Sequence, residues 1–573
     1  MFIKTTKSKD YEYIKLVESY RENGTTKHRV LYNFGRADQI KKDESFLNVV
    51  KRLCEIAEIT IDNDPEADNK SIFDNCNEAT FYNYGYLAYL KLWKELAIED
   101  ILYGLQSGTK TQFPVPETAF LMAVQHLLEP RSKLSTYTHQ NRYFNLTNIP
   151  LQHMYRTLDK LGVWKEDIES ELFEYNYVRT GQQVDVVFYD VTTFAFESII
   201  ADELKDFGYS KDCKFNEVQV VMGMIIDING MPVGYELFQG NTFDGKTMVS
   251  ALNNIKKRFG IHRVIIVADR GLNIKVNLKL IKEAGYGYIM ASKIKGMSNT
   301  MKEKVLSTEG FETVSDASGK EVFRYKTIPY TNVFKDENNE THRLEENLII
   351  TYSAKRAKKN QKDRERLVEK AKQLLEHPEK IKSSNKRGGK KYIDQTDPEQ
   401  AQTWALAEEK IKQDARFDGY YGIQTSEKNM SAIEVMEAYH TLWKIEESFR
   451  IMKSTMEVRP VFHWTPKRIR GHFVICFLSF LMERKLEYCL KGVKDEVLAS
   501  PNKIQESLNS MQLAVIETDS QGEMYIKVKP DPLSEKIFRL LKLDLPHNIN
   551  QKSDLIARFQ LDEGLAPKQM SFF

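Results

Sequence analysis

Two aspartates stand directly after apolar segments, where they could hold a divalent metal ion. Asp190 follows the apolar residues 186–189, and Asp269 follows residues 264–268. An unpaired carboxylate is costly inside a buried sheet, so each aspartate is expected at a sheet rim. If the two segments are parallel neighbouring strands, the carboxylates meet at one end, and their hard oxygen atoms suit Mg²⁺ or Mn²⁺. Either aspartate by itself is also typical of a turn after a strand.

A third acidic residue, Glu446, lies in a segment that predicts a helix over residues 438–454. At about 100° per residue, Tyr439, Glu446, Arg450 and Lys453 share one stripe beside an apolar face. Glu446 could then be a third metal ligand with two phosphate-binding cations beside it. The same spacing also fits a glutamate that stabilises an exposed helix by pairing with the basic residues one and two turns further along.

These residue types fit the hydrolysis and transfer of phosphodiester bonds. Charge develops on the attacking and leaving oxygens, and two metal ions about 3.5–4 Å apart can stabilise both. Holding two such ions requires several anionic ligands, which Asp190, Asp269 and Glu446 would supply. This chemistry needs no side-chain nucleophile, and the sequence offers no convincing Ser-His-Asp or Cys-His arrangement.

The elements that must position these residues follow an α/β pattern. From residue 182 the sequence predicts three strands, of which the second and third form a hairpin around residues 228–231. A helix over residues 244–260, the strand before Asp269, a helix over residues 274–285 and a strand over residues 286–292 follow. The order β-β-β-α-β-α-β predicts one mixed sheet with helices packed on it.

The flanking regions differ from this pattern. The first 35 residues predict a hairpin around Glu22-Asn23-Gly24, and helical spacing dominates residues 77–180. Residues 295–435 hold candidate strands in EVFRYKTIPY, ENLIITYSA and DGYYGIQTS, and residues 436–573 read as helical again.

The overall charge does not select a class of partner, but its placement is uneven. Lys and Arg number 83 against 81 Asp and Glu, which leaves a net charge of +2. Between Lys355 and Lys391, however, 15 Lys or Arg face 5 acidic residues, ending in Lys386-Arg387-Gly388-Gly389-Lys390-Lys391. This basic segment is either an electrostatic clamp on phosphates or a solvated helix and loop.

The composition predicts a soluble protein of the cytoplasm. Hydrophobic residues make up 41% and charged residues 29%, which is ordinary for a globular protein. The five cysteines are far apart and have no metal-ligand spacing, so reduced thiols are expected. No signal peptide is visible, and the longest apolar run, residues 473–482, is about half of the ~20 residues that a membrane helix needs.

Together, the three acidic segments resemble the DDE transposases of bacterial insertion sequences, and most closely the insertion-sequence-four group. FYDVTTFAFES is similar to the first-aspartate strand of that group, and IVADRGL to its second-aspartate loop. Tyr439, Glu446 and Lys453 match its tyrosine-arginine-glutamate-lysine helix, with Leu442 at the position of the arginine and Arg450 on the same predicted face. Blocks at residues 208–247 and 459–482 extend the likeness to about half of the chain.

The resemblance implies a transposase with a ribonuclease-H-like core and a β-rich insertion between the second aspartate and the glutamate. Such enzymes bind terminal inverted repeats of double-stranded DNA, pair two ends in a homodimer or larger assembly, cut the DNA and join it to a target. By this likeness Asp190, Asp269 and Glu446 bind two Mg²⁺ or Mn²⁺ ions, while Tyr439 and Lys453 contact phosphates. In a bacterium such an enzyme would be associated with the nucleoid when on DNA.

Three further cations, Lys467, Arg468 and Arg470, follow this helix closely in the sequence. They either extend the DNA-binding track or begin a solvated helix after Pro466. The expected domains are an N-terminal region with the hairpin (1–75), a helical domain that could bind DNA (76–180), two parts of the catalytic core (181–295 and 436–487), the insertion with the basic segment (296–435) and a helical C-terminal region (488–573).

Two other functions fit the same residues. One is another ribonuclease-H-like nuclease, such as a resolvase or repair enzyme, against which the long insertion and the Tyr-Glu-Lys helix argue. The other is a domesticated or decayed transposase that binds DNA without cutting it. The complete set of acidic residues argues against decay, whereas Leu442 leaves the group's signature incomplete.

Overall fold

The computed structural model describes most of the chain between residues 2 and 561. The residues outside the description in this range are 9–10, 23–24, 41–79, 147, 199, 209–216, 243, 261–263, 316–317, 337–338, 378–380, 382–387, 396–403, 459–460, 462, 492–498 and 519–521. The expected turn at Asn23-Gly24 and the cations Lys386 and Arg387 therefore lie outside the described residues.

The chain forms two compact units, each assembled from segments that are distant in the sequence. The first unit contains Met1–Thr180, Phe194–Asp202 and Arg450–Phe573, and the second contains Gly181–Thr193 and Glu203–Phe449.

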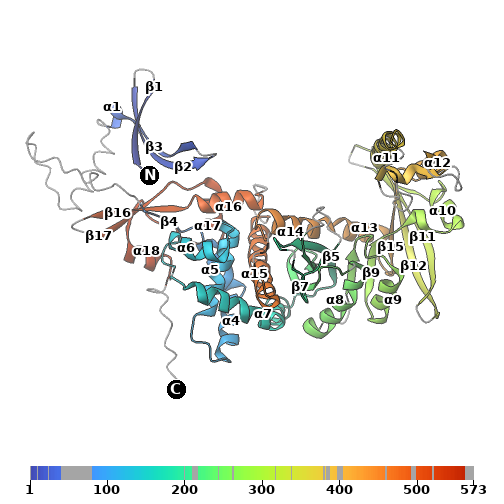
Figure 1. Cartoon of the computed structure of the whole chain (residues 1–573), viewed down its shortest axis with the longest axis horizontal. Helices are drawn as coiled ribbons and strands as arrows, with labels where there is room; N and C mark the ends of the chain where they lie inside the picture. Colours follow the sequence, from blue (N-terminus) through green and yellow to red (C-terminus); the bar gives the residue numbers. More distant parts are fainter. Residues whose placement is uncertain are drawn as a thin grey trace, which may run out of the picture. The chain divides into compact units, whose positions relative to one another are not determined.

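A nine-stranded mixed sheet is the framework of the second unit (Figure 1). Its strand order is β10-β11-β12-β15-β9-β8-β5-β6-β7. The strands are β5 (Val186–Ala195), β6 (Gln219–Asp227), β7 (Pro232–Gln239), β8 (Ile265–Ala268), β9 (Gly287–Ala291), β10 (Glu312–Ser315), β11 (Glu321–Lys335), β12 (Thr341–Tyr352) and β15 (Tyr420–Thr425).

The order of elements predicted from the sequence is confirmed in the centre of this sheet. β6 and β7 form the expected antiparallel hairpin, and β5, β8 and β9 run parallel. The crossovers contain α8 (Asp244–Phe259) and α9 (Lys275–Glu283). The central strands are almost wholly buried, which explains why they read as continuous apolar runs rather than alternating ones.

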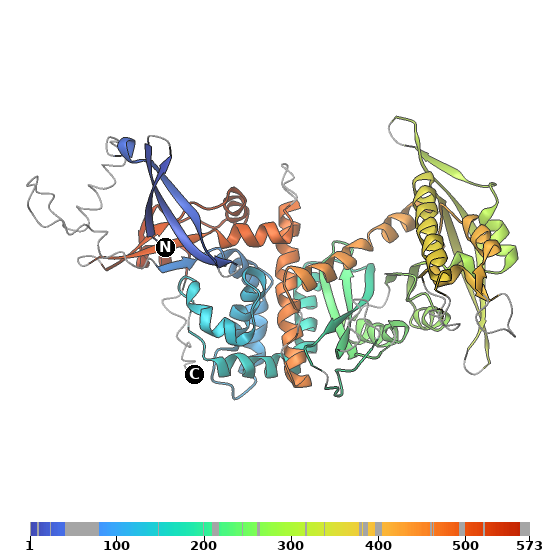
Figure 2. The same cartoon turned by 45° about the horizontal axis from the view of Figure 1, so that its top comes forward.

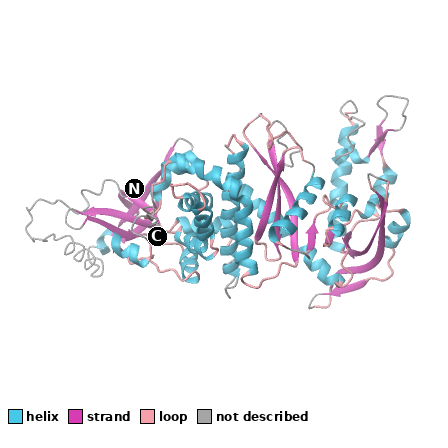
Figure 3. Ribbon diagram, turned by 90° about the horizontal axis from the view of Figure 1, so that it is seen from below, coloured by secondary structure: helices cyan, strands magenta, loops and turns pink. Residues whose placement is uncertain are grey.

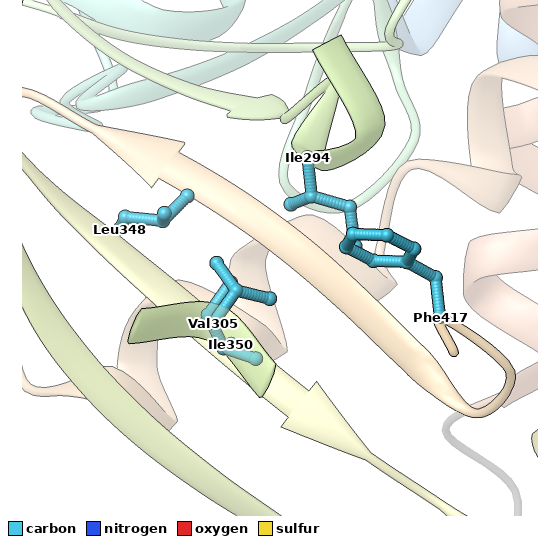
Figure 4. Close-up of a cluster of buried hydrophobic side chains, with 5 residues drawn as sticks. All are labelled: Ile294, Val305, Leu348, Ile350 and Phe417. Atoms are coloured by element: carbon cyan, nitrogen blue, oxygen red, sulfur yellow. The ribbon is translucent and has the colours of Figure 1, made fainter. Parts of the chain in front are cut away.

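Strands from the segment expected to be an insertion belong to the same sheet. β15 pairs antiparallel with β9, and β12, β11 and β10 continue outward from β15. Ile294, Val305, Leu348, Ile350 and Phe417 form a buried cluster beside these strands (Figure 4). The other elements here are η3 (Ile294–Gly296), α10 (Asn299–Leu306), α11 (Ala354–Leu375), η5 (Gly388–Tyr392), β13 (Ile393–Gln395), β14 (Trp404–Leu406) and α12 (Glu408–Ala415).

The first unit has a helical core, in which the long helices α7 (Leu151–Phe173) and α15 (Pro466–Lys491) pack against each other (Figure 2). Residues 471–484 of α15 are buried, yet no described helix is long and apolar enough to cross a membrane. The other helices are α1 (Ala37–Ile40), α3 (Leu87–Glu95), α4 (Ile98–Ser107), α5 (Val115–Leu128), α6 (Lys133–His139), η1 (Gln140–Arg142), η2 (Glu174–Val178), α16 (Pro501–Asn509), α17 (Pro532–Leu540) and α18 (Lys552–Arg558).

Two antiparallel sheets complete the first unit, and Figure 3 shows their strands in magenta. β1 (Phe2–Ser8), β2 (Tyr11–Glu22) and β3 (Thr25–Arg36) form the first sheet, which contains the predicted hairpin and one additional strand. The second sheet joins β4 (Thr80–Asn83) to β16 (Gln512–Thr518), β17 (Gly522–Lys527) and β18 (Ile549–Gln551). The expectation that the C-terminal region is only helical was therefore wrong, because these short strands alternate with helices.

Candidate active site

Asp190 and Asp269 are neighbours where β8 ends, although β5 continues through Asp190 to Ala195. β5 and β8 pair in parallel with Tyr189 opposite Ala268, and the aspartates are the next residue beyond this pair on each chain segment. Neighbouring strands lie about 4.8 Å apart, and both aspartates are partly buried. The parallel arrangement that the sequence left open is therefore present, and it brings Asp190 next to the turn that begins at Asp269. The expectation that Asp190 ends its strand was wrong, because β5 extends beyond β8 to Ala195.

Backbone hydrogen bonds hold the Asp269 carboxylate in the turn after β8. The amide groups of Gly271 and Leu272 donate to its Oδ1 at 2.6 and 3.3 Å. At Asp190, the amide of Val191 donates to Oδ1 at 2.8 Å. Asp269 can therefore be a turn residue and a metal ligand at once. Its Oδ1 accepts the hydrogen bonds of the turn, and its Oδ2 is available for another ligand.

Tyr439 locates Glu446 relative to Asp269. Glu446 is exposed in the first turn of α14 (Trp443–Ser454). Burial is the main cause that raises the pKa of the Tyr439 hydroxyl, followed by Tyr421 and by the negative charges of Asp269 and Glu446. Asp269 and Glu446 are therefore both near enough to the Tyr439 hydroxyl for their charges to act on it.

The donor set fits hard divalent cations. Two carboxylates come from adjacent chain segments and one from a helix, and all offer the oxygen atoms that Mg²⁺ and Mn²⁺ prefer. The three do not belong to the two described groups whose ligand atoms all lie within 4.8 Å of one another, which are His126, His472 and Cys476, and Asp336, Glu340 and His342.

Two residues near Tyr439 were not among the site residues that the sequence predicted. The hydroxyl groups of Tyr421, on β15, and Tyr439 are hydrogen-bonded at 2.7 Å. The guanidinium of Arg356, at the start of α11, lies 4.0 Å from the centre of the Tyr421 ring. The available signal was indirect, because Arg356 belongs to the basic segment and Tyr421 to a predicted strand, but only the folded sheet brings them together.

The expected single helix over residues 438–454 was wrong, because it is interrupted. α13 (Ala432–His440) carries Tyr439, and α14 carries Glu446, with Thr441 and Leu442 between them. The Thr441 hydroxyl donates to the Glu437 carbonyl at 3.0 Å, and hydrogen bonds between residues three apart replace the helical pattern here. Such side-chain bonds to the preceding turn bend helices without any proline or glycine.

The cations that were expected to bind DNA belong to the first compact unit. Arg450 is exposed on α14, and Lys453 is half-buried with its ammonium 5.7 Å from the centre of the Phe194 ring. At the start of α15, Lys467 is exposed and Arg470 is half-buried. Arg468 pairs with Asp159 at 3.3 Å and lies over the Tyr155 ring.

The basic segment forms an exposed helix followed by a short turn. α11 buries only Ala371, and Lys355, Lys358, Lys359 and Lys362 are all exposed on it. Other cations of the segment have acidic partners: Arg364 binds Asp418, and Lys391 binds Asp414. The segment therefore holds both structural ion pairs and an exposed group of lysines.

Comparisons with known proteins agree on one protein family. The family model described as transposase DDE domain matches residues 182–482, and the model described as IS1634 family transposase, N-terminal domain, matches residues 3–64. No curated protein matches the chain.

Two solved structures are similar to the chain at low identity. A piggyBac transposase synaptic complex with hairpin DNA is 9% identical, with 86% of this chain and 90% of that chain covered and a TM-score of 0.37. A Mos1 transposase paired-end complex with the left transposon end is 12% identical, with 31% and 60% covered and a TM-score of 0.14. At these TM-scores the likeness carries no argument about the site.

Proposed function

Because the chain belongs to the DDE transposases, by a family match over residues 182–482, we propose that Asp190, Asp269 and Glu446 are its catalytic carboxylates. The protein is an insertion-sequence DNA transposase that cuts and joins DNA in a metal-dependent reaction. The observation that supports the residue assignment is the parallel pairing of β5 with β8, because Asp190 and Asp269 directly follow the last paired residues of the two strands.

DDE transposases use divalent metal ions, and here two Mg²⁺ or Mn²⁺ ions would be held by the three carboxylates. When bound, such ions stabilise the charge on the attacking and leaving oxygens of the phosphodiester. The amides of Gly271 and Leu272 orient Asp269 before any ligand arrives. Because the side chain is already ordered, ligand binding has a smaller entropic cost.

Tyr439 would act on the DNA as a neutral hydrogen-bonding group. Burial and the neighbouring negative charges raise the pKa of its phenol, so the hydroxyl keeps its proton at neutral pH. The hydrogen bond with the Tyr421 hydroxyl fixes the position of Tyr439, and Arg356 holds the Tyr421 ring by lying over it. A neutral phenol can donate a hydrogen bond to a phosphate oxygen beside the carboxylates without adding charge there.

DNA is the partner that this function requires, and the finer assignments follow the resemblance of the sequence. We assign Arg450, Lys453, Lys467, Arg468 and Arg470 to contacts with DNA phosphates. The nine-stranded sheet would be a ribonuclease-H-like core of the insertion-sequence-four type, with residues 296–435 as its insertion and residues 76–180 as a helical domain that helps to bind the inverted repeats. Two copies of the chain would pair the transposon ends.

The test is strand cleavage of DNA carrying the element's own ends, with and without Mg²⁺ or Mn²⁺. Asp190→Asn, Asp269→Asn and Glu446→Gln are each expected to lower the cleavage rate by at least about 10³-fold, because each removes an anionic ligand. Binding of the ends, measured by fluorescence anisotropy, should change little.

Matched controls exist on the same elements. Asp185→Asn changes an exposed aspartate directly before β5, and Glu437→Gln changes an exposed glutamate on α13. Both should cut normally. A triad variant that cuts as fast as the wild type does not belong to the site, and a wild type that binds the ends but never cuts with any metal would be a decayed transposase.

A further inference from the structure

The first unit contains a half-open pocket of about 430 Å³ that no part of the proposed site uses. Its described lining comes from the end of α5 and the start of α6, from Tyr155 of α7, and from the segment that leads into α15. Basic and neutral nitrogen-bearing side chains dominate this lining: His126, Arg131, Lys133, His463 and His472. The charges of these side chains determine what the pocket can hold.

Lys133 is a buried cation without an acidic partner. The residue is 4% exposed, and its ammonium donates to the Nε2 of His126 at 3.1 Å. No described carboxylate lies within ion-pair distance of it, and the exposed Glu457 on the lining makes no such pair. Burial lowers the pKa of Lys133 to about 8, so the ammonium is still mostly protonated at pH 7. A buried, unpaired charge is costly unless a counter-ion arrives.

Three histidines around Lys133 are neutral at physiological pH. Burial, followed by neighbouring positive charges, lowers the pKa of His463 to about 3 and the pKa values of His126 and His472 well below 6.5. The Nδ1 of His126 lies 3.3 Å from the Met456 carbonyl, which can only accept a hydrogen bond, so Nδ1 is the protonated nitrogen. A neutral imidazole offers one N–H donor and adds no charge.

Arg131 does not make the pocket less positive, because it belongs to an ion-paired group. Its guanidinium pairs with Glu129 at 2.7 Å, and Glu129 also binds Arg142. The three side chains together keep one positive charge. The pocket and its margin therefore have an excess of positive charge and of N–H donors.

A metal ion fits this pocket less well than an anion does. The ligand atoms of His126, His472 and Cys476 lie within 4.8 Å of one another, which is a plausible zinc set by residue type. Zinc would need the Nε2 lone pair of His126 at about 2.0–2.1 Å. The Lys133 ammonium already occupies that lone pair at 3.1 Å.

We propose that this pocket binds one phosphate group of DNA, with the Lys133 ammonium as its charge partner and the imidazoles of His463 and His472 as hydrogen-bond donors. Arg468 lies over the ring of Tyr155, which lines the pocket, and places a further cation at the pocket margin. The inference rests on the proposed function only for the source of the phosphate, because the pocket chemistry does not involve the carboxylates.

The test uses the full chain without divalent metal, so that binding is measured apart from cutting. The salt dependence of binding to a labelled DNA duplex is compared for the wild type, Lys133→Met and Lys160→Met. Loss of one phosphate contact should reduce the slope of log K against log salt by about 0.9 in Lys133→Met. Lys160→Met makes the same charge change at a half-buried lysine over the Trp164 ring, outside the pocket lining, and should keep the wild-type slope.

Inorganic phosphate and Zn²⁺ are the other two probes. At constant ionic strength, phosphate should weaken DNA binding by the wild type and not by Lys133→Met. An unchanged slope in Lys133→Met, or an equal loss in Lys160→Met, overturns the proposal. Phosphate binding that depends on Lys133 without any effect on DNA would assign the pocket to free phosphate instead. One Zn²⁺ bound per chain and lost in Cys476→Ala would make it a metal site.

A second variant protects the test against misfolding. Removal of a buried charge should leave the melting temperature of Lys133→Met equal to or above that of the wild type. If Lys133→Met does not fold, His463→Phe removes one proposed donor and keeps the ammonium. It should lower the affinity for phosphate several-fold, and unchanged phosphate affinity would contradict the proposed pocket.

Discussion

At the scale of single residues, Glu346 shows how burial sets a protonation state in the second unit. The residue is 2% exposed on β12, the Tyr288 hydroxyl donates to its Oε1, and the Gln424 amide donates to its Oε2. Burial raises the pKa of this carboxyl from 4.5 to about 7, although the hydrogen bonds lower it. The folded protein therefore binds this proton more tightly than the unfolded chain does.

This difference predicts a pH dependence of stability. Since the folded-state pKa is the higher one, the contribution is complete below about pH 4.5 and is lost as the pH rises to about 7. Its size is on the order of 3 kcal/mol. The free energy of unfolding at pH 5 and pH 8 should differ less in Glu346→Gln than in the wild type.

Glu345→Gln is the control, because Glu345 precedes Glu346 on β12 and is exposed. It should keep the wild-type pH profile. If Glu346→Gln keeps that profile as well, Glu346 is ionised in the folded protein and its pKa is not raised.

Some of these residues could be predicted from the sequence and others could not. Asp190 and Asp269 follow apolar runs, and the cost of burying a charge correctly predicted that Asp269 follows the end of its strand. The same argument missed that β5 continues past Asp190 to Ala195. Glu346 shares a strand face with Leu348 and Ile350, which is a usable signal that it points inward. Nothing local indicates that Lys133 is buried, because its partner His126 lies on the other side of the turn between α5 and α6.

At the scale of elements, β6 must approach β5 closely beside Asp190. Gly223 lies on β6, and a Cβ atom there would overlap the hydroxyl of Tyr189 and lie 2.9 Å from its Cζ. Tyr189 is buried and directly precedes Asp190. The glycine is therefore required by the tyrosine side chain and not by any turn.

Gly223→Ala should destabilise the protein by about 1–3 kcal/mol, because it overpacks a close contact. Adding Tyr189→Phe removes the overlapping hydroxyl and should restore part of the loss, as measured by urea unfolding. Gly296→Ala is the control, since a Cβ there meets nothing within 4 Å. If the double variant is no more stable than Gly223→Ala alone, the contact is not the cause.

The helices and strands also show which features the local sequence pattern cannot predict. The strands and the helices between them were predicted because hydrophobic periodicity is a local property, whereas the parallel pairing of β5 with β8 was left open. The break between α13 and α14 was not predicted, because it depends on the side chain of Thr441 in a segment without proline or glycine. β16 and β17 were missed because short strands between helices give a weak pattern, and β16 pairs with β4 from the other end of the chain.

At the scale of the whole molecule, the net charge of +2 cannot supply affinity for DNA by itself. Affinity must come from local groups of cations, and each phosphate that such a group neutralises adds to the salt dependence of binding. The exposed lysines of α11 are one such group, since Lys358 and Lys362 lie one turn apart on an exposed helix surface. Their ion-paired neighbours Arg364 and Lys391 hold the segment in place instead.

The double variant Lys358→Gln, Lys362→Gln should therefore weaken DNA binding about equally for all sequences and reduce the salt slope by about 1.8. Lys302→Gln with Lys304→Gln makes the same charge change on α10 of the same unit and should leave the slope unchanged. Glu446→Gln should show the opposite pattern, with a normal slope and no cutting, because its role is confined to the reaction. If the α11 variant keeps the wild-type slope, its lysines are a solvated surface, and the DNA track must lie elsewhere on the chain.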